Sequence, residues 1–193
     1  MRQSIRLVIG FSLLVGCSRT VAIPNYSPTE TARAAFTEYD KDGDGALDAA
    51  ELERCPALKS FVKRRGKAKT LLLADLEQEL LALNQGTIGS MAVSVRVMRA
   101  GNPLSGARVT LVPEKFHGTT LKSASGVTGN DGRAQMEQEG SGQIGAAPGF
   151  YRIVISLKDA QGSETLPARY NSATELGEQI HTSSKGGIVI KLD

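Results

Sequence analysis

Five carboxylates and two glycines between Asp40 and Glu51 constrain this chain more than any other stretch. The segment reads DKDGDGALDAAE, with oxygen-bearing side chains at its first, third, fifth, ninth and twelfth positions. Gly45 occupies the sixth position, where the backbone must turn sharply, and the aliphatic Leu47 occupies the eighth. A hard divalent cation needs about six to eight oxygen ligands, and alternate residues of a tight loop can point their side chains at one centre. The spacing therefore predicts an oxygen-lined cation site.

The same pattern resembles the EF-hand calcium loop at every diagnostic position. The resemblance implies that the loop binds Ca²⁺ as its cofactor. It also implies the ligands, which are the side chains of Asp40, Asp42 and Asp44, the carbonyl of Ala46, Asp48 directly or through a water, and both oxygens of Glu51. The alternative interpretation is an acidic, glycine-rich surface turn that binds no ion.

Helix signals lie on both sides of this loop. Ser27 can cap a helix that starts at Pro28 and ends near Tyr39, with Glu30 completing a capping box. The exit helix is expected to turn Cys55 toward the core and to break at the following proline. Residues 71–83 predict an amphipathic helix with Leu72, Leu76, Leu80 and Leu83 on one side. Residues 27–86 are therefore predicted to form one helical module.

EF-hand loops usually pair through a short strand at the eighth position, so a second loop is expected in this module. Residues 65–76 occupy the expected place, with Leu72 at the eighth position. Cationic residues (Arg65, Lys67 and Lys69) replace the first three ligands, and Leu76 replaces the twelfth. The resemblance therefore implies a degenerate partner loop that keeps the fold and has lost the ion. The basic run 63–69 is expected to be a solvated loop beside the acidic site, with an anionic lipid or acidic polymer surface as the alternative.

The N-terminus has the features of an export signal. Two arginines precede an apolar run over residues 7–15, which is too short to span a bilayer as a helix. The tetrapeptide Leu-Val-Gly-Cys ending at Cys17 resembles a bacterial lipobox. This resemblance implies removal of residues 1–16, lipidation of Cys17, a tether over residues 17–26, and an exported protein anchored by lipid to the cell envelope, periplasmic or surface-facing. The alternative is an ordinary secretory signal that leaves Cys17 a plain thiol.

From about Met91 the hydrophobic pattern changes from helical to alternating, and short strands follow one another between turn signals. An antiparallel β-sandwich is the expected architecture. Residues 91–193 resemble the carboxypeptidase regulatory-like, transthyretin-like domains of bacterial surface proteins, through the segments 101–109, 127–134 and 148–153. The family usually has Thr-Asp before its Asp-Gly turn, whereas Gly129 and Asn130 stand between Thr128 and Asp131 here.

Signals for catalysis are missing from the sequence. It has no P-loop, dinucleotide fingerprint or nucleophile elbow. His117 and His181 lie far apart without a carboxylate at ligand spacing, and both are expected at exposed loops or edges. Without the two arginines of the predicted leader, 21 basic residues face 20 acidic ones, which gives no electrostatic case for nucleic acid.

The sequence therefore predicts an α+β chain in two parts, a helical EF-hand pair followed by an antiparallel β-sandwich. The predicted function is a calcium-binding, membrane-anchored exported lipoprotein, not an enzyme, whose sandwich serves adhesion or structure through an unknown protein or envelope partner. Two alternatives stay open, a calcium-regulated signalling component and an accessory subunit of an envelope enzyme complex. Calcium is expected to hold the helical module together while barely affecting a sandwich with a separate core.

Overall fold

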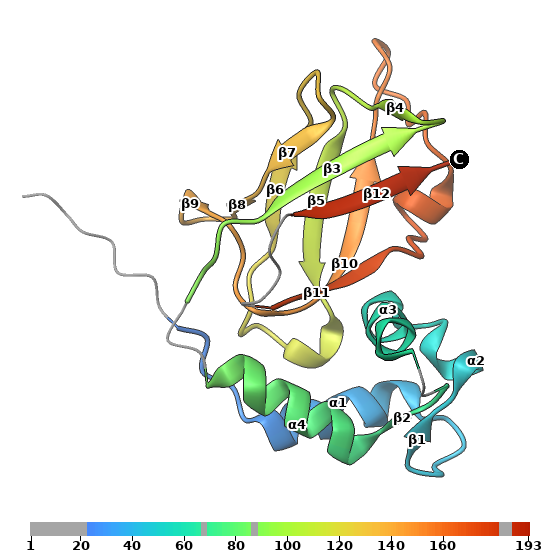
Figure 1. Ribbon diagram of the computed structural model, residues 1–193, viewed down its shortest axis with the longest axis vertical. Helices are drawn as coiled ribbons and strands as arrows, with labels where there is room; N and C mark the ends of the chain where they lie inside the picture. Colours follow the sequence, from blue (N-terminus) through green and yellow to red (C-terminus); the bar gives the residue numbers. More distant parts are fainter. Residues whose placement is uncertain (1–22, 67–68, 86–88, 182–186) are drawn as a thin grey trace, which may run out of the picture.

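The computed structural model describes residues 23–66, 69–85, 89–181 and 187–193, and it shows a mixed α+β chain (Figure 1). Helices form the first part of the chain, and two open sheets form the second. The predicted leader 1–16, Cys17 and most of the predicted tether lie outside the described residues. Within the described ranges, every helix is too short or too polar to cross a membrane.

Helix α1, Pro28–Tyr39, begins where the capping signal predicts. The Ser27 side chain accepts the N–H of Glu30 at 3.3 Å, and a proline fits the first helical turn. The Glu30 carboxylate pairs with Arg33 at 3.2 Å instead of closing the predicted capping box. Its buried side includes Ala32, Ala35, Phe36 and Tyr39, which recur at helical spacing.

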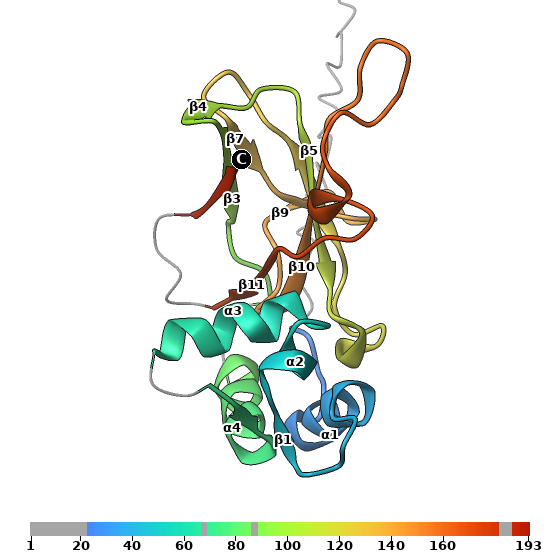
Figure 2. The same ribbon diagram turned by 90° about the vertical axis from the view of Figure 1, so that its right-hand side faces the viewer.

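Three further helices follow, α2 (Ala49–Leu52), α3 (Pro56–Arg65) and α4 (Leu73–Asn84). Two short strands, β1 (Ala46–Leu47) and β2 (Leu71–Leu72), pair antiparallel between them. The predicted break is confirmed, because α3 starts at the proline that cannot continue α2. Helices α1 and α4 lie side by side beneath the sheets (Figures 1 and 2).

The second part consists of two sheets packed face to face. One has six strands in the order β11-β10-β5-β6-β8-β9, and the other has the order β12-β3-β4, with β7 also paired to β3. The bounds are β3 Ser94–Arg99, β4 Asn102–Pro103, β5 Arg108–Pro113, β6 Ala124–Val127, β7 Arg133–Gln135, β8 Glu137–Gln138, β9 Gln143–Ile144, β10 Gly149–Ser156, β11 Gly177–Ile180 and β12 Ile188–Leu192, with short 3-10 helices η1 at Lys115–His117 and η2 at Ala168–Tyr170.

One pairing departs from the antiparallel prediction. Strand β12 runs parallel to β3, with Ile188 opposite Val95 and Leu192 opposite Arg99 (Figure 1). A parallel pair needs a crossover connection, and here the chain crosses between the two sheets, from β11 in one to β12 in the other. An alternating hydrophobic pattern shows that a strand is half-buried, but it does not show the direction of the neighbouring strand, so the sequence pattern could not predict this pairing.

The hydrophobic residues form two clusters. One fills the space between the sheets and includes Val95, Val97, Leu111, Ile153 and Ile155. The other fills the helical part, and it also contains Phe116 and Phe150 from the sheet part. Phe61 of α3 packs edge-on against Phe150, with ring centroids 5.5 Å apart. The expectation of a separate sandwich core holds for the cluster between the sheets, whereas Phe116 and Phe150 at the end of the sandwich pack into the core of the helices. The helices lie against this end of the sheets (Figure 2).

Backbone contact adds to this shared core. Gly177, the first residue of β11, lies so close to α3 that a Cβ there would overlap the backbone of Pro56 and Ala57. Only glycine permits such an approach. Helix α3 is thus held directly against β11 and β10.

Candidate metal centre

The acidic loop between α1 and α2 brings three carboxylates together. Ligand oxygens of Asp40, Asp42 and Asp44 all lie within 4.8 Å of one another, with the first half-buried and the other two exposed. Gly43 and Gly45 have φ angles of 74° and 82°, a backbone region that side chains disfavour. These two glycines let the chain fold tightly enough for alternate side chains to converge.

Backbone N–H groups orient the three carboxylates. Asp40 accepts the N–H of Gly43 at 2.7 Å and that of Gly45 at 3.1 Å. Asp42 accepts from Asp44 at 3.2 Å, and Asp44 accepts from Ala46 at 2.8 Å. Each carboxylate has about four lone-pair sites, so these bonds leave oxygen capacity for a cation.

The last two predicted ligands lie where the loop enters α2. One Asp48 oxygen caps α2 by accepting the N–H groups of Ala50 and Glu51, at 2.8 and 2.9 Å. Glu51 is buried, and its two oxygens accept the N–H groups of Lys41 at 2.6 Å and of Asp48 at 3.1 Å. Glu51 therefore joins the start of the loop to its end. Asp48 and Glu51 lie outside the group of three converging side chains.

The charges of the loop act on one another. The N–H of Asp44 lowers the pKa of Asp42, but desolvation and the charges of Asp44, Glu51 and Asp40 outweigh this effect, so the pKa is raised overall. Mutual repulsion of this kind is relieved by a bound cation. The converging donors are all carboxylate oxygens, the ligand type that Ca²⁺ and Mg²⁺ prefer, whereas zinc favours nitrogen and sulfur. The residues present therefore fit a hard divalent cation.

The partner segment is shifted by one residue from the predicted register. Leu47 pairs with Leu71, and Ala46 pairs with Leu72, so Leu71 stands at the eighth-position equivalent. Leu71 is 1% exposed and Leu72 is 51% exposed, which corrects the placement of Leu72 on the buried side. A run of adjacent leucines explains the error, because either residue satisfies the apolar pattern.

This shift makes Asp75, not Leu76, the counterpart of Glu51, because each is the third residue of the helix that follows its strand. Asp75 pairs with Arg65 at 3.6 Å, so its charge is already neutralised within the segment. The partner segment is also shorter, since Leu71 follows the helix-capping Gly66 by five residues while Leu47 follows Asp40 by seven.

The basic run is partly described. Lys63, Arg64 and Arg65 end α3, and residues 67–68 lie outside the described residues. Arg64 pairs with Glu178 of β11, and the Arg65 guanidinium lies 5.4 Å from the centre of the Phe61 ring. The first three residues of the run therefore belong to a helix and not to the expected solvated loop, and at least these two cations contact partners within the protein.

Two further side chains were singled out in the sequence. Cys55 is buried as predicted, and burial raises the pKa of its thiol, so it is not a reactive thiolate. His117 was expected to be exposed, but it is only 3% exposed, and its Nε2 accepts the N–H of Phe150 at 3.1 Å. Aromatic rings of Tyr26, Phe116 and Phe150 surround it. The histidine is part of the shared core, and the turn-like sequence around it did not indicate that role.

Among the described residues, the most deeply buried acid is one that the sequence pattern did not single out. Glu114 follows the last residue of β5 and is 1% exposed, at the contact between the helices and the sandwich. Nothing in its local pattern distinguishes it from a surface glutamate, because its partners come from residues 39–57 and from β10.

Comparison of the chain with protein-family models, with curated proteins and with solved structures finds no match.

Proposed function

We propose that this chain is an exported, membrane-anchored protein that binds one calcium ion in the Asp40–Glu51 loop and uses its sandwich for non-catalytic contacts. The convergence of Asp40, Asp42 and Asp44 carries the calcium proposal. These side chains, with Asp48, Glu51 and the carbonyl of Ala46, would hold the ion. The bound ion would offset the repulsion among five carboxylates and fix the loop.

The EF-hand interpretation of the whole helical part belongs to this proposal. Supporting it are the antiparallel β1–β2 pair between two loops and the equivalent helix positions of Glu51 and Asp75. The second loop, with its shorter backbone and internally paired acid, is proposed to shape the first without binding an ion. A single site of this kind is expected to have a dissociation constant of roughly 10⁻⁶–10⁻⁴ M.

Calorimetric titration of the purified chain with Ca²⁺ tests this proposal. One ion should bind per chain, and Asp44→Asn should weaken binding at least about tenfold because a charged ligand is lost. Asp131→Asn is the matched control, since Asp131 is exposed and accepts the N–H of Arg133 in a turn of the sandwich. Absence of calcium binding, or equal weakening by both variants, would contradict the proposal.

Export and lipid attachment rest on the N-terminal sequence alone. The proposal is that residues 1–16 are removed and that Cys17 carries lipid. Intact-mass measurement of the membrane-extracted protein should show that truncation together with added acyl mass. Cys17→Ala should release the protein from membranes, whereas Cys55→Ala should not, because Cys55 is buried in the helical core. An unmodified Cys17 in the mature protein would contradict the assignment.

A calcium-regulated component is the second candidate, and one observation favours it. The helices that flank the loop share a hydrophobic core with the sandwich, so a change at the loop can reach the sandwich surface. The binding partner of the sandwich should then be captured from solubilised membranes in calcium and lost in chelator. Equal capture in both conditions favours the purely structural role of the ion.

A further inference from the structure

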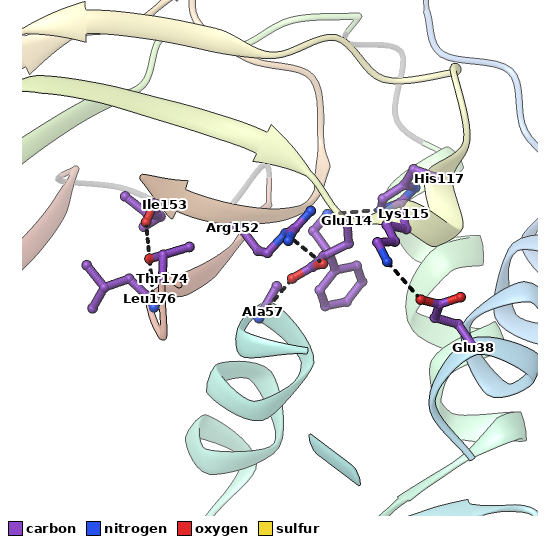
Figure 3. Close-up of polar contacts among 10 residues, drawn as sticks. Glu38, Ala57, Glu114, Lys115, His117, Arg152, Ile153, Thr174 and Leu176 are labelled. Atoms are coloured by element: carbon purple, nitrogen blue, oxygen red, sulfur yellow. Dashed lines mark hydrogen bonds and ion pairs between the residues drawn. The ribbon is translucent and has the colours of Figure 1, made fainter. Parts of the chain in front are cut away.

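Glu114 makes polar contacts with both the helices and the sandwich (Figure 3). One of its oxygens, Oε1, accepts the N–H of Ala57 in the first turn of α3 at 3.4 Å. The other, Oε2, lies 3.4 Å from Nε of Arg152 on β10. The Arg152 side chain is 34% exposed, while that of Glu114 is 1% exposed. The acid is thus buried, paired and aimed at the helices.

Both flanks of the acidic loop lie around this carboxylate. On the entry side, Tyr39 is buried and immediately precedes Asp40. On the exit side, Cys55 is buried and stands at the N-cap of α3. Burial raises the pKa of Glu114, and Arg152, the Ala57 N–H, the Cys55 thiol and the Tyr39 hydroxyl each act to lower it. Of these groups, the Ala57 N–H and the Arg152 guanidinium each lie 3.4 Å from a carboxylate oxygen.

The exit flank is short and continuously hydrogen-bonded. The N–H of Arg54 donates to Glu51 O at 3.1 Å, that of Cys55 to Leu52 O at 3.0 Å, and that of Lys59 to Cys55 O at 3.0 Å. A displacement of the start of α3 would therefore move Glu51, which receives the N–H of Lys41 at the start of the loop. The start of α3 also lies in close backbone contact with Gly177 of β11.

We infer that Glu114 and Arg152 are positioning residues that hold the two flanks of the acidic loop together. This inference rests on the proposed calcium site. It means that contacts with the sandwich help to set the affinity of the loop for calcium. A metal site with fixed flanks loses less freedom on binding than one with loose flanks, and this difference appears as affinity. Groups outside the ligand shell that orient ligands typically change metal affinity by about 10–100-fold when they are mutated. We expect an effect near the lower limit, because Glu114 holds the flanks and not the ligands.

Two variants separate positioning from a simple charge effect. A field effect alone would make Glu114→Gln bind calcium more weakly, because a negative charge is lost, but would not make Arg152→Gln bind more weakly, because a positive charge is lost. Positioning makes both variants bind more weakly, since each removes one partner of the same buried pair. A second ion pair, between Lys115 and Glu38 at 3.0 Å, joins the same segments but is exposed and provides the matched control (Figure 3).

The test is calcium titration of the full chain in detergent, for wild type and for each variant. Glu114→Gln should bind about tenfold more weakly and Arg152→Gln several-fold more weakly, while Lys115→Gln should change affinity less than about twofold. Val97→Ala, a change in the sandwich core far from these contacts, controls for lost stability and should leave the affinity of the folded protein unchanged. Unchanged affinity in folded Glu114→Gln, or tighter binding by Arg152→Gln, would overturn the inference.

A separate measurement covers the case in which Glu114→Gln does not fold. Coupling is reciprocal, so calcium should slow hydrogen exchange of the Ala57 amide in the wild-type chain. An exchange rate that calcium does not change would overturn the inference even though the ion binds. Failure of wild type to bind calcium at all would instead overturn the proposed function on which the inference rests.

Discussion

The two loops that are joined by the β1–β2 pair share the arrangement of a short strand followed by a helix, and they differ in chemistry. Each places a buried leucine in its strand, Leu47 or Leu71, and an acidic residue at the third position of the next helix. In the first loop that acid, Glu51, accepts backbone N–H groups from the loop itself. In the second loop, Asp75 pairs with the guanidinium of Arg65.

The comparison separates what holds a loop in shape from what binds an ion. Strand pairing and a buried leucine are present in both loops, so these features do not require the cation-binding carboxylates. Of the two loops, only the first has converging carboxylates and two glycines with positive φ among its described residues. Calcium binding is therefore predicted to depend on side chains of the first loop, and stability on apolar residues of both.

The largest expected effect comes from a variant that removes the buried leucine of the second loop. Leu71→Ala should lower the free energy of unfolding by about 2–5 kcal/mol, because it leaves a cavity at a fully buried position. Leu72→Ala, one residue along and half-exposed, should change it by less than about 0.5 kcal/mol. Urea unfolding in chelator measures both values. The reverse order would restore the originally predicted register, with Leu72 opposite Leu47.

The next largest effect comes from a variant that removes a calcium ligand and keeps the strand pairing and the helices. Glu51→Gln loses an anionic ligand, and it should lose most of the calcium-dependent stabilisation, which is about 2.7 kcal/mol for wild type at a hundredfold excess over the dissociation constant. Unfolding in calcium and in chelator gives this difference directly. Glu53→Gln, which alters only an exposed ion pair with Lys59, is the control and should keep the full difference.

A smaller effect concerns the contact between the helices and the sandwich, where His117 is buried. Burial lowers the pKa of His117 from 6.5 to about 3. Between these two pH values the histidine is protonated in the unfolded chain but neutral in the folded chain. The stability is fully present above about pH 6.5 and should fall by up to about 1.4 kcal/mol per pH unit below it. Burial of Glu114 raises its pKa and acts in the opposite sense, since the folded chain then binds a proton more readily than the unfolded one.

His117→Gln isolates the histidine contribution, because it removes the titrating ring and keeps an acceptor for the Phe150 N–H. Its stability should depend less steeply on pH than that of wild type between about pH 7 and 5. Urea unfolding in chelator measures both slopes. Equal slopes would show that the buried histidine does not contribute.

The smallest expected effect is at the counterpart of Glu51. Asp75→Asn should leave one calcium bound per chain and change its affinity less than about threefold, because the acid is already paired with Arg65 and partly exposed. Stability should change by less than about 1 kcal/mol. Calorimetric titration decides, and a lost or strongly weakened calcium ion would mean that the second loop takes part in binding.

Local signals predicted much of this molecule. The start of α1 follows from Ser27 and the following proline, and the break before α3 follows from Pro56. Alternation of valines predicted strand β3, and Val95 and Val97 are fully buried in it. These features depend on residues that are close together in the sequence, so the spacing of those residues is enough to predict them.

The features that were missed depend on distant partners. His117 and Glu114 are buried because helices from another part of the chain cover them, and Gly177 is close to α3 for the same reason. The parallel direction of β12 depends on how the chain crosses between sheets. The leucine register depends on β2 pairing with β1, and Leu71 and Leu72 look alike in the sequence. None of these leaves a periodic signal.

Calorimetric scanning of the chain with calcium and with chelator tests the central claim most directly. Because the loop, the helices and the sandwich end share contacts, calcium should move one cooperative transition upward by about 5–10 °C at a hundredfold excess over the dissociation constant. In Glu51→Gln most of this upward shift should be lost. A wild-type transition that calcium leaves in place would contradict the calcium site. A helical transition that moves alone, while a separate sandwich transition stays fixed, would contradict the shared core.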